Sequence, residues 1–133
     1  MSTRADIRTG SPNRVLGYAF GAVYLLVGLV GFTLTAGTGF AATAGPHLLF
    51  FEINPLHNLV HVAIGALLAG AAWRGAGTAK AANTTVGAVY LLVAVVGLFL
   101  VGNAGNLLAL NHADNILHFA SAAVLLGVGL TRR

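Results

Sequence analysis

The chain has 133 residues, of which 57% are hydrophobic and only 8% are charged, and its mean hydropathy is +0.85. Soluble domains carry roughly 25% charged residues, so this composition excludes a water-soluble globular protein and predicts an integral membrane protein. The net charge of +4 does not indicate nucleic-acid binding, because the seven basic residues flank apolar segments instead of forming one patch. The absence of cysteine excludes disulfides, iron–sulfur clusters and thiolate metal sites.

Four apolar segments are long enough to cross a hydrocarbon core of about 30 Å. Before them, residues 1–13 are polar and predict a short flexible cytoplasmic tail, and residues 14–133 predict one transmembrane domain. The loop over residues 36–53 ends in an aromatic and aliphatic cluster, which we expect to lie at the membrane interface as a turn of helix. The sequence therefore predicts an all-α, four-helix transmembrane bundle, with spans over residues 14–35, 54–73, 84–101 and 114–130.

The basic residues predict how these spans are oriented. With four spans, every Lys and Arg falls on one side of the membrane: Arg4, Arg8, Arg14, Arg74, Lys80, Arg132 and Arg133. Cytoplasmic loops of membrane proteins carry the excess of Lys and Arg. We therefore expect a multi-pass protein of the bacterial cytoplasmic membrane with both termini inside.

Two stretches recur along the chain and indicate an internal duplication. The segment Gly21–Val27 returns unchanged as Gly87–Val93, 66 residues later, and an Asn/His stretch around His61 returns around His118, 57 residues later. Each copy holds two spans, so the copies are parallel and related by a pseudo-two-fold axis along the membrane normal. We expect repeat one over residues 14–73 and repeat two over residues 80–130, with the second and fourth spans diagonal in the bundle.

With these motifs the chain resembles a bacterial family of small four-span membrane proteins of unknown function. The resemblance covers residues 15–130 and rests on the Asn-x-x-His starts of spans two and four and on the Gly-Ala-Val-Tyr runs of spans one and three. It implies a four-helix membrane protein built from a duplicated two-helix unit, and it implies no particular activity.

The Asn-x-x-His pairs predict a polar site inside the bundle. Each terminal His lies about 10 Å below the outer end of its span at 1.5 Å per residue. Polar side chains at that depth avoid lipid and find partners inside the protein. One interpretation is a hydrogen-bonded network that sets helix register in a small structural or accessory protein, formed by Asn58, His61, Asn115, His118, Tyr24 and Tyr90.

Other interpretations give the histidines a ligand. His61 and His118 at equal depth are suited to holding a haem between them. Adding His57 and Asp114 makes a set of four nitrogen and oxygen ligands for a divalent metal. Asp114 has an alternative role as a cap of the fourth span, which the position at its start favours.

A third interpretation is a small conduit or proton-handling protein, because histidine titrates near neutral pH and ionisable groups in a membrane are often functional. No acidic or basic residue lies deep in a span to complete such a path.

No nucleotide-binding motif or catalytic triad is present, so the sequence does not predict an enzyme. The expected partners are the lipid bilayer and either a larger membrane complex or further copies of the chain.

Overall fold

The computed structural model describes residues 10–131, which form four long helices. All four are long and apolar enough to cross a membrane, which confirms the predicted all-helical, four-span architecture. The helices are α1 (Pro12–Leu34), α2 (Pro55–Arg74), α3 (Ala76–Leu100) and α4 (His112–Thr131).

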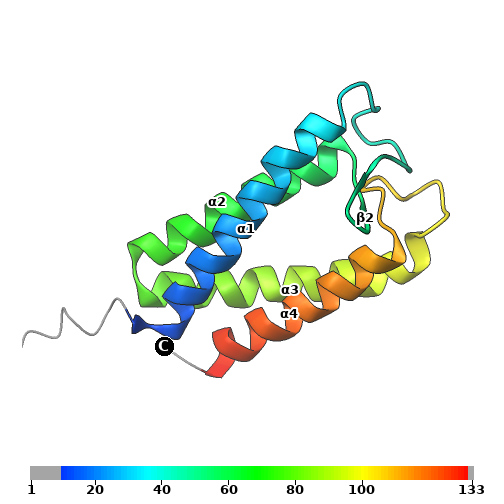
Figure 1. Ribbon diagram of the computed structural model, residues 1–133. Coiled ribbons are helices and arrows are strands. Elements are labelled where there is room, and N and C mark those ends of the chain that lie inside the picture. The colour runs from blue at the N-terminus through cyan, green and yellow to red at the C-terminus, as the bar shows by residue number, and fades with distance from the viewer. Residues whose placement is uncertain (1–9, 132–133) are drawn as a thin grey trace, which may run out of the picture.

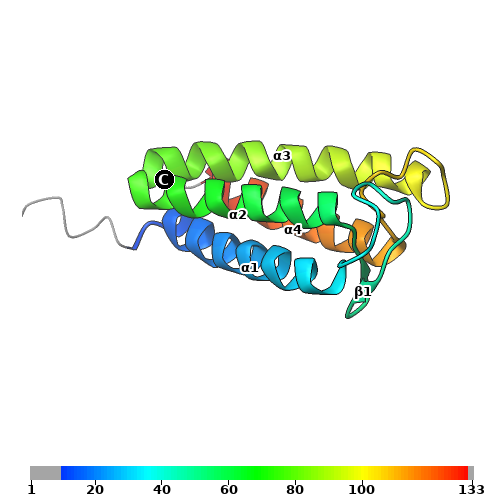
Figure 2. The ribbon, with the colours of Figure 1, turned by 90° about the horizontal axis from the view of Figure 1, so that it is seen from above.

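The helices are arranged as two hairpins in a V (Figure 1). Helix α1 packs along α2, and α3 packs along α4. The hairpins meet at one end of the molecule, where the α2–α3 turn lies together with the start of α1 and the end of α4; we call this the termini end. They separate toward the opposite end, the loop end, and α2 and α4 occupy opposite corners, as Figures 1 and 2 together show.

The wide end of the V is filled by the long loop between α1 and α2. This loop contains two short antiparallel strands, β1 (His47–Leu48) and β2 (Phe51–Glu52), in which His47 pairs with Glu52 and Leu48 with Phe51. The expected turn of helix in this loop was wrong. A hairpin forms instead because the Glu52 carboxylate accepts a hydrogen bond from the Gly45 N–H at 2.8 Å, and the Pro46 carbonyl accepts one from the Ile53 N–H at 3.0 Å.

Glycines bring α1 and α2 close together. A Cβ atom at Gly21 would stand 2.9 Å from the Gly65 carbonyl oxygen, and one at Gly65 would stand 2.8 Å from the Gly21 oxygen. Real Cβ atoms do not approach backbone so closely, so both positions require glycine. This small-residue contact is how helices in lipid maximise their van der Waals packing.

Two asparagines link the hairpins at the loop end. Asn54 caps α2 by accepting the His57 N–H at 2.8 Å, and its side-chain amide donates to the carbonyl of Leu107, in the loop of the other hairpin, at 2.8 Å. Asn111 caps α4 by accepting the Asp114 N–H at 2.9 Å, and its amide donates to the Phe50 carbonyl in the first loop at 2.9 Å. Each asparagine thus accepts a hydrogen bond from a backbone N–H at the start of its own helix and donates one to a carbonyl in the opposite half of the chain.

A second polar contact holds the termini end. Asn83 of α3 donates to the backbone carbonyl and the side-chain oxygen of Asn13 at 3.0 and 2.9 Å, and Arg14 donates to the Ala72 carbonyl at 2.8 Å. Asn13 is fully buried in the first turn of α1, so Pro12 and Asn13, which the sequence analysis assigned to the tail, belong to the helix. Residues 1–9 of that tail lie outside the described residues.

Candidate metal centre

Three histidines meet near the wide end of the V. His57 and His61 are one turn apart on α2, and His118 comes from α4 in the other hairpin. Each is 5% exposed or less. One ring nitrogen from each histidine lies within 4.8 Å of the other two, so the imidazoles converge on a common point.

Aromatic rings pack around these imidazoles. The ring of His57 lies 4.6 Å from that of His61 and 6.1 Å from that of His118, measured between centroids. Tyr90 stacks on His118 at 5.1 Å, and Tyr24 lies against His61 at 5.5 Å. The rings of Tyr24 and Tyr90 touch edge to face at 5.5 Å, so one aromatic cluster joins all four helices.

The expected hydrogen-bonded network does not form around the histidines. Both ring nitrogens of His57 and the Nδ1 atoms of His61 and His118 are buried without a hydrogen-bond partner. The hydroxyl groups of Tyr24 and Tyr90 are also buried and do not bond the imidazoles, because Tyr90 stacks on His118 and the ring of Tyr24 lies tilted against that of His61. Buried polar groups in proteins nearly always have partners, so this cluster is a place where a ligand would supply them.

The asparagines of the predicted site lie beside the histidines, against glycines. A Cβ atom at Gly31 would overlap the side chain of Asn58, and one at Gly97 would overlap that of Asn115. Asn58 donates to the Thr35 hydroxyl at 3.1 Å, whereas both polar side-chain atoms of Asn115 are unpaired. These amides therefore set the contacts between paired helices and do not join the three imidazoles.

Asp114 acts as part of the α4 cap. Its carboxylate accepts the Asn111 N–H at 2.9 Å, while its own N–H donates to the Asn111 side chain, which is a reciprocal capping arrangement. The cluster of convergent ligand atoms contains His57, His61 and His118 without Asp114. The metal set predicted from the sequence is therefore reduced by one residue, because the cap holds its carboxylate at the start of the helix.

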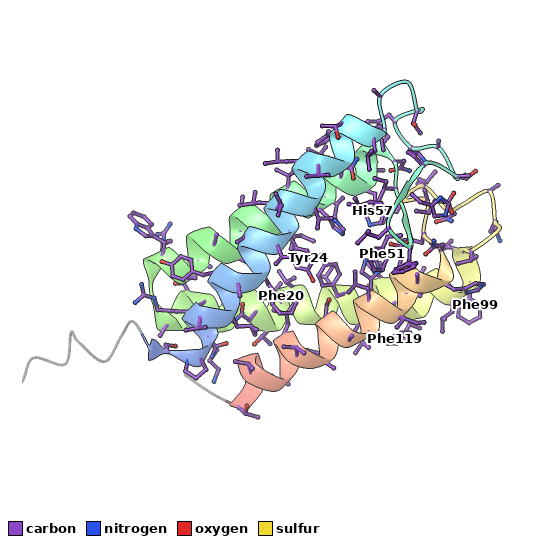
Figure 3. All side chains as sticks on the ribbon, viewed as in Figure 1. Phe20, Tyr24, Phe51, His57, Phe99 and Phe119 are labelled. Carbon is purple, nitrogen blue, oxygen red and sulfur yellow. The ribbon has the colours of Figure 1, made fainter. Side chains whose placement is uncertain are left out.

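A cavity of about 430 Å³ lies between α1 and α4, beneath the β1–β2 hairpin, and reaches His61 of the histidine cluster. Its walls are almost entirely apolar, although Tyr24, His61, Asp114 and Ser121 are among the residues that line it. Figure 3 shows Phe20 and Tyr24 between the two hairpins, with Phe51 and His57 nearer the loop end.

The structure brings together the three histidines and two tyrosines that the sequence analysis named, beside neighbours that it did not name. Thr35, the partner of Asn58, and the cavity were not predicted. The signal for the asparagine contacts was present, because Gly31 and Gly97 stand at the same position of the two repeats, as do Asn58 and Asn115.

The fold and the site together define a multi-pass membrane protein with a buried tri-histidine cluster. The chain belongs to a family described as "Domain of unknown function (DUF4383)", whose model matches residues 14–131. No curated protein and no solved structure matches the chain.

Proposed function

We propose that this membrane protein binds one divalent transition-metal ion through His57, His61 and His118. The observation that carries the proposal is the convergence of three buried ring nitrogens within 4.8 Å. The same rings have nitrogens with no hydrogen-bond partner, so a metal would satisfy groups that otherwise lose their solvation.

The chemistry of the donors selects the class of metal. Neutral imidazole suits zinc, copper, nickel and iron, whereas magnesium and calcium prefer oxygen ligands. Within residues 10–131 no fourth protein ligand joins the three histidines, which is also the arrangement in which zinc keeps one position for water or another molecule. The cluster is therefore suited to a four-coordinate ion such as Zn²⁺.

The geometry is close to what such an ion needs. Zinc–nitrogen bonds of about 2.0–2.1 Å in a tetrahedron place the nitrogens roughly 3.4 Å apart. His57 and His61 stand four residues apart on one face of α2, a spacing at which two histidines can bind one ion. The third ligand comes from the other hairpin, so an ion would link the two arms of the V and stabilise the fold.

The same geometry disfavours a haem between His61 and His118. A bis-histidine haem places its flat macrocycle between two axial rings. Here the ring of His57 lies 4.6 Å from that of His61 and 6.1 Å from that of His118, in the space that the macrocycle would need.

The two histidines of α2 differ from a metalloprotease motif at one position. In the His-Glu-x-x-His motif, a glutamate base follows the first histidine. Here Asn58, which donates a hydrogen bond to Thr35, stands at that position.

The test is metal analysis of the protein purified in mild detergent without a polyhistidine tag, before and after adding Zn²⁺. We expect one ion per chain and its loss in His57→Ala, His61→Ala and His118→Ala. The exposed histidines His47 and His112 provide matched controls, and their alanine variants should keep the metal. Protein that binds no added Zn²⁺, or controls that lose it equally, would refute the proposal.

We also infer that the termini end faces the cytoplasm and that the histidine cluster lies toward the outer side. Arg14, Arg74 and Lys80 stand at the termini end, and Glu52 and Asp114 stand at the loop end. Because the chain has no cysteine, single cysteines at the exposed positions Gly39 and Gly77 can report sidedness. An impermeant maleimide added to intact cells should label the Gly39→Cys protein only; labelling of Gly77→Cys alone would reverse the orientation.

A further inference from the structure

The tri-histidine cluster is covered at the loop end. His57 lies in the first turn of α2, so it is the histidine of the cluster closest to that end. Its ring lies beside the backbone carbonyls of Glu52 in β2 and Leu108 in the loop between α3 and α4, and it is 2% exposed. The two loops therefore stand between the cluster and the aqueous phase, and an ion has to pass them to reach the ring nitrogens from this side.

The other routes to the cluster suit an ion less well. The cavity that reaches His61 has almost entirely apolar walls and lies between two membrane spans. A cation would have to enter it from the hydrocarbon layer, which is costly for a charge. Toward the termini end, the core residues Leu68 and Leu125 are fully buried between the helices. The loop end thus offers the shortest path from water.

The β1–β2 hairpin spans the wide end of the V. β1 contacts α1 and β2 contacts α4, so the hairpin reaches from one arm to the other (Figure 1). Its turn residues Leu49 and Phe50 are 79% and 76% exposed. Leu49 has a φ of 57°, in the left-handed region, which costs free energy for a residue other than glycine. A segment with few buried contacts and a strained turn opens more readily than the helices around it.

A hydrogen bond fastens the turn of the hairpin to the second half of the chain. The Phe50 carbonyl accepts it from the side-chain amide of Asn111, just before α4, at 2.9 Å. At its base the hairpin is held by the buried residues Ile53 and Asn54, and the Asn54 amide donates to carbonyls of both loops. The base is therefore the fixed side of the hairpin, and the turn is the side that can move.

We propose that the β1–β2 hairpin is a lid over the tri-histidine cluster, that a metal ion enters and leaves when this lid opens, and that the Asn111–Phe50 hydrogen bond is the latch that holds it closed. The inference rests on the metal site proposed above and adds how ions exchange there. The latch involves none of the three histidines, so it acts equally on the free and the ion-bound protein. Weakening it should speed entry and release by the same factor and leave the equilibrium affinity unchanged.

The first experiment weakens the latch. Asn111→Ser keeps a side-chain oxygen that can cap α4 and removes the amide that reaches Phe50. Mixing Zn²⁺-loaded protein in mild detergent with excess fluorescent chelator times the release, and competition with the chelator at equilibrium gives the affinity. We expect release about five-fold faster at unchanged affinity. The matched control is Asn103→Ser, at an exposed asparagine of the same loop that bonds only within that loop, and it should release the ion as the original protein does.

The second experiment locks the lid. Because the chain has no cysteine, Phe50→Cys and His112→Cys can be introduced together and joined by a short bismaleimide. Both positions are exposed, and they lie at the two ends of the latch. We expect the crosslinked protein to release Zn²⁺ more slowly, by about ten-fold or more, than the same variant treated with N-ethylmaleimide.

The outcomes separate the lid from the metal site. If one ion binds but neither Asn111→Ser nor the crosslink changes its release, the lid is overturned and the metal site stands. Faster release in Asn111→Ser with a matching loss of affinity would also overturn the lid, because Asn111 would then stabilise the bound state and not the closed one. Protein that binds no Zn²⁺ at equilibrium would refute the metal site, and the lid with it.

Discussion

The two halves of the molecule share a framework but differ in the residues that make the site. Both carry a capping asparagine, an asparagine against a glycine, and a histidine beside a tyrosine. At the position of His57 in the first half, the second half has Asp114, and at the position of Ile64 it has Ser121. The residues that both halves share hold the helices together. Because the halves differ at the position of His57, the histidine cluster takes two imidazoles from the first half and one from the second.

The halves also differ in how closely their helices approach. Gly28 and Gly65 in the first hairpin correspond to Ala94 and Ala122 in the second. A Cβ atom at Gly28 would stand 2.7 Å from the Asn58 carbonyl oxygen, so α1 and α2 require glycine where α3 and α4 accept a methyl group. The duplication thus preserved the pattern of small residues while allowing one pair of helices to pack less closely than the other.

The largest expected effect comes from making the halves alike at the site. His57→Asp copies the second half and removes one of three imidazole ligands. We expect the affinity for Zn²⁺ to fall by about 100-fold or more, measured by competition with a chelator. The His112→Asp variant places the same new carboxylate on the exposed side of α4 and should bind as the original protein does. Because a carboxylate can itself bind Zn²⁺, His57→Ala is measured alongside, and unchanged affinity in both variants would remove His57 from the site.

A second prediction concerns the close contact of the first hairpin. Gly21→Ala should lower the free energy of unfolding by about 2 kcal/mol, because its methyl group would overlap backbone atoms of Gly65 and Ala69. Gly127→Ala is the matched control, since no atom of the described residues lies within 4 Å of its added Cβ. Unfolding in a titration with sodium dodecyl sulfate measures both, and equal stability of the two variants would contradict the packing described here.

The two capping asparagines should contribute unequally to the free energy of unfolding. Asn54→Ala removes the cap of α2 together with hydrogen bonds to Ala42 and Leu107, whereas Asn111→Ala removes the cap of α4 and one bond to Phe50. We expect losses of about 2 kcal/mol for Asn54→Ala and about 1 kcal/mol for Asn111→Ala. The same detergent titration compares them, and a larger loss for Asn111→Ala would reverse the ranking.

The smallest expected change in stability comes from exchanging, between the two halves, the residue that hydrogen-bonds the buried asparagine. Asn58 donates a hydrogen bond to Thr35, but Val101 stands at the equivalent position of the second half. Thr35→Val should destabilise the protein by about 0.6 kcal/mol, and Val101→Thr should restore a partner to Asn115 and stabilise it by a similar amount. Effects of the same sign in both variants would show that these hydroxyls do not act through the asparagines.

Much of the architecture followed from the sequence, because a bilayer leaves few choices. Backbone groups in lipid must be satisfied within the segment, so four long apolar stretches can only form helices. The repeat of Gly21–Val27 and of the Asn/His stretch predicted the two hairpins, and the depth of His61 and His118 predicted that they face inward. His57 was a candidate because it lies four residues before His61.

The tertiary structure decided which of these residues meet. The opening of the V, the burial of Asn13 against Asn83 and the hairpin in the first loop depend on contacts between segments far apart in the chain. Asp114 and His57 stand at equivalent sequence positions, yet one caps a helix and the other turns its ring toward His61 and His118. Periodicity places a side chain on a helix face, but only the packing of one helix against another determines what that face touches.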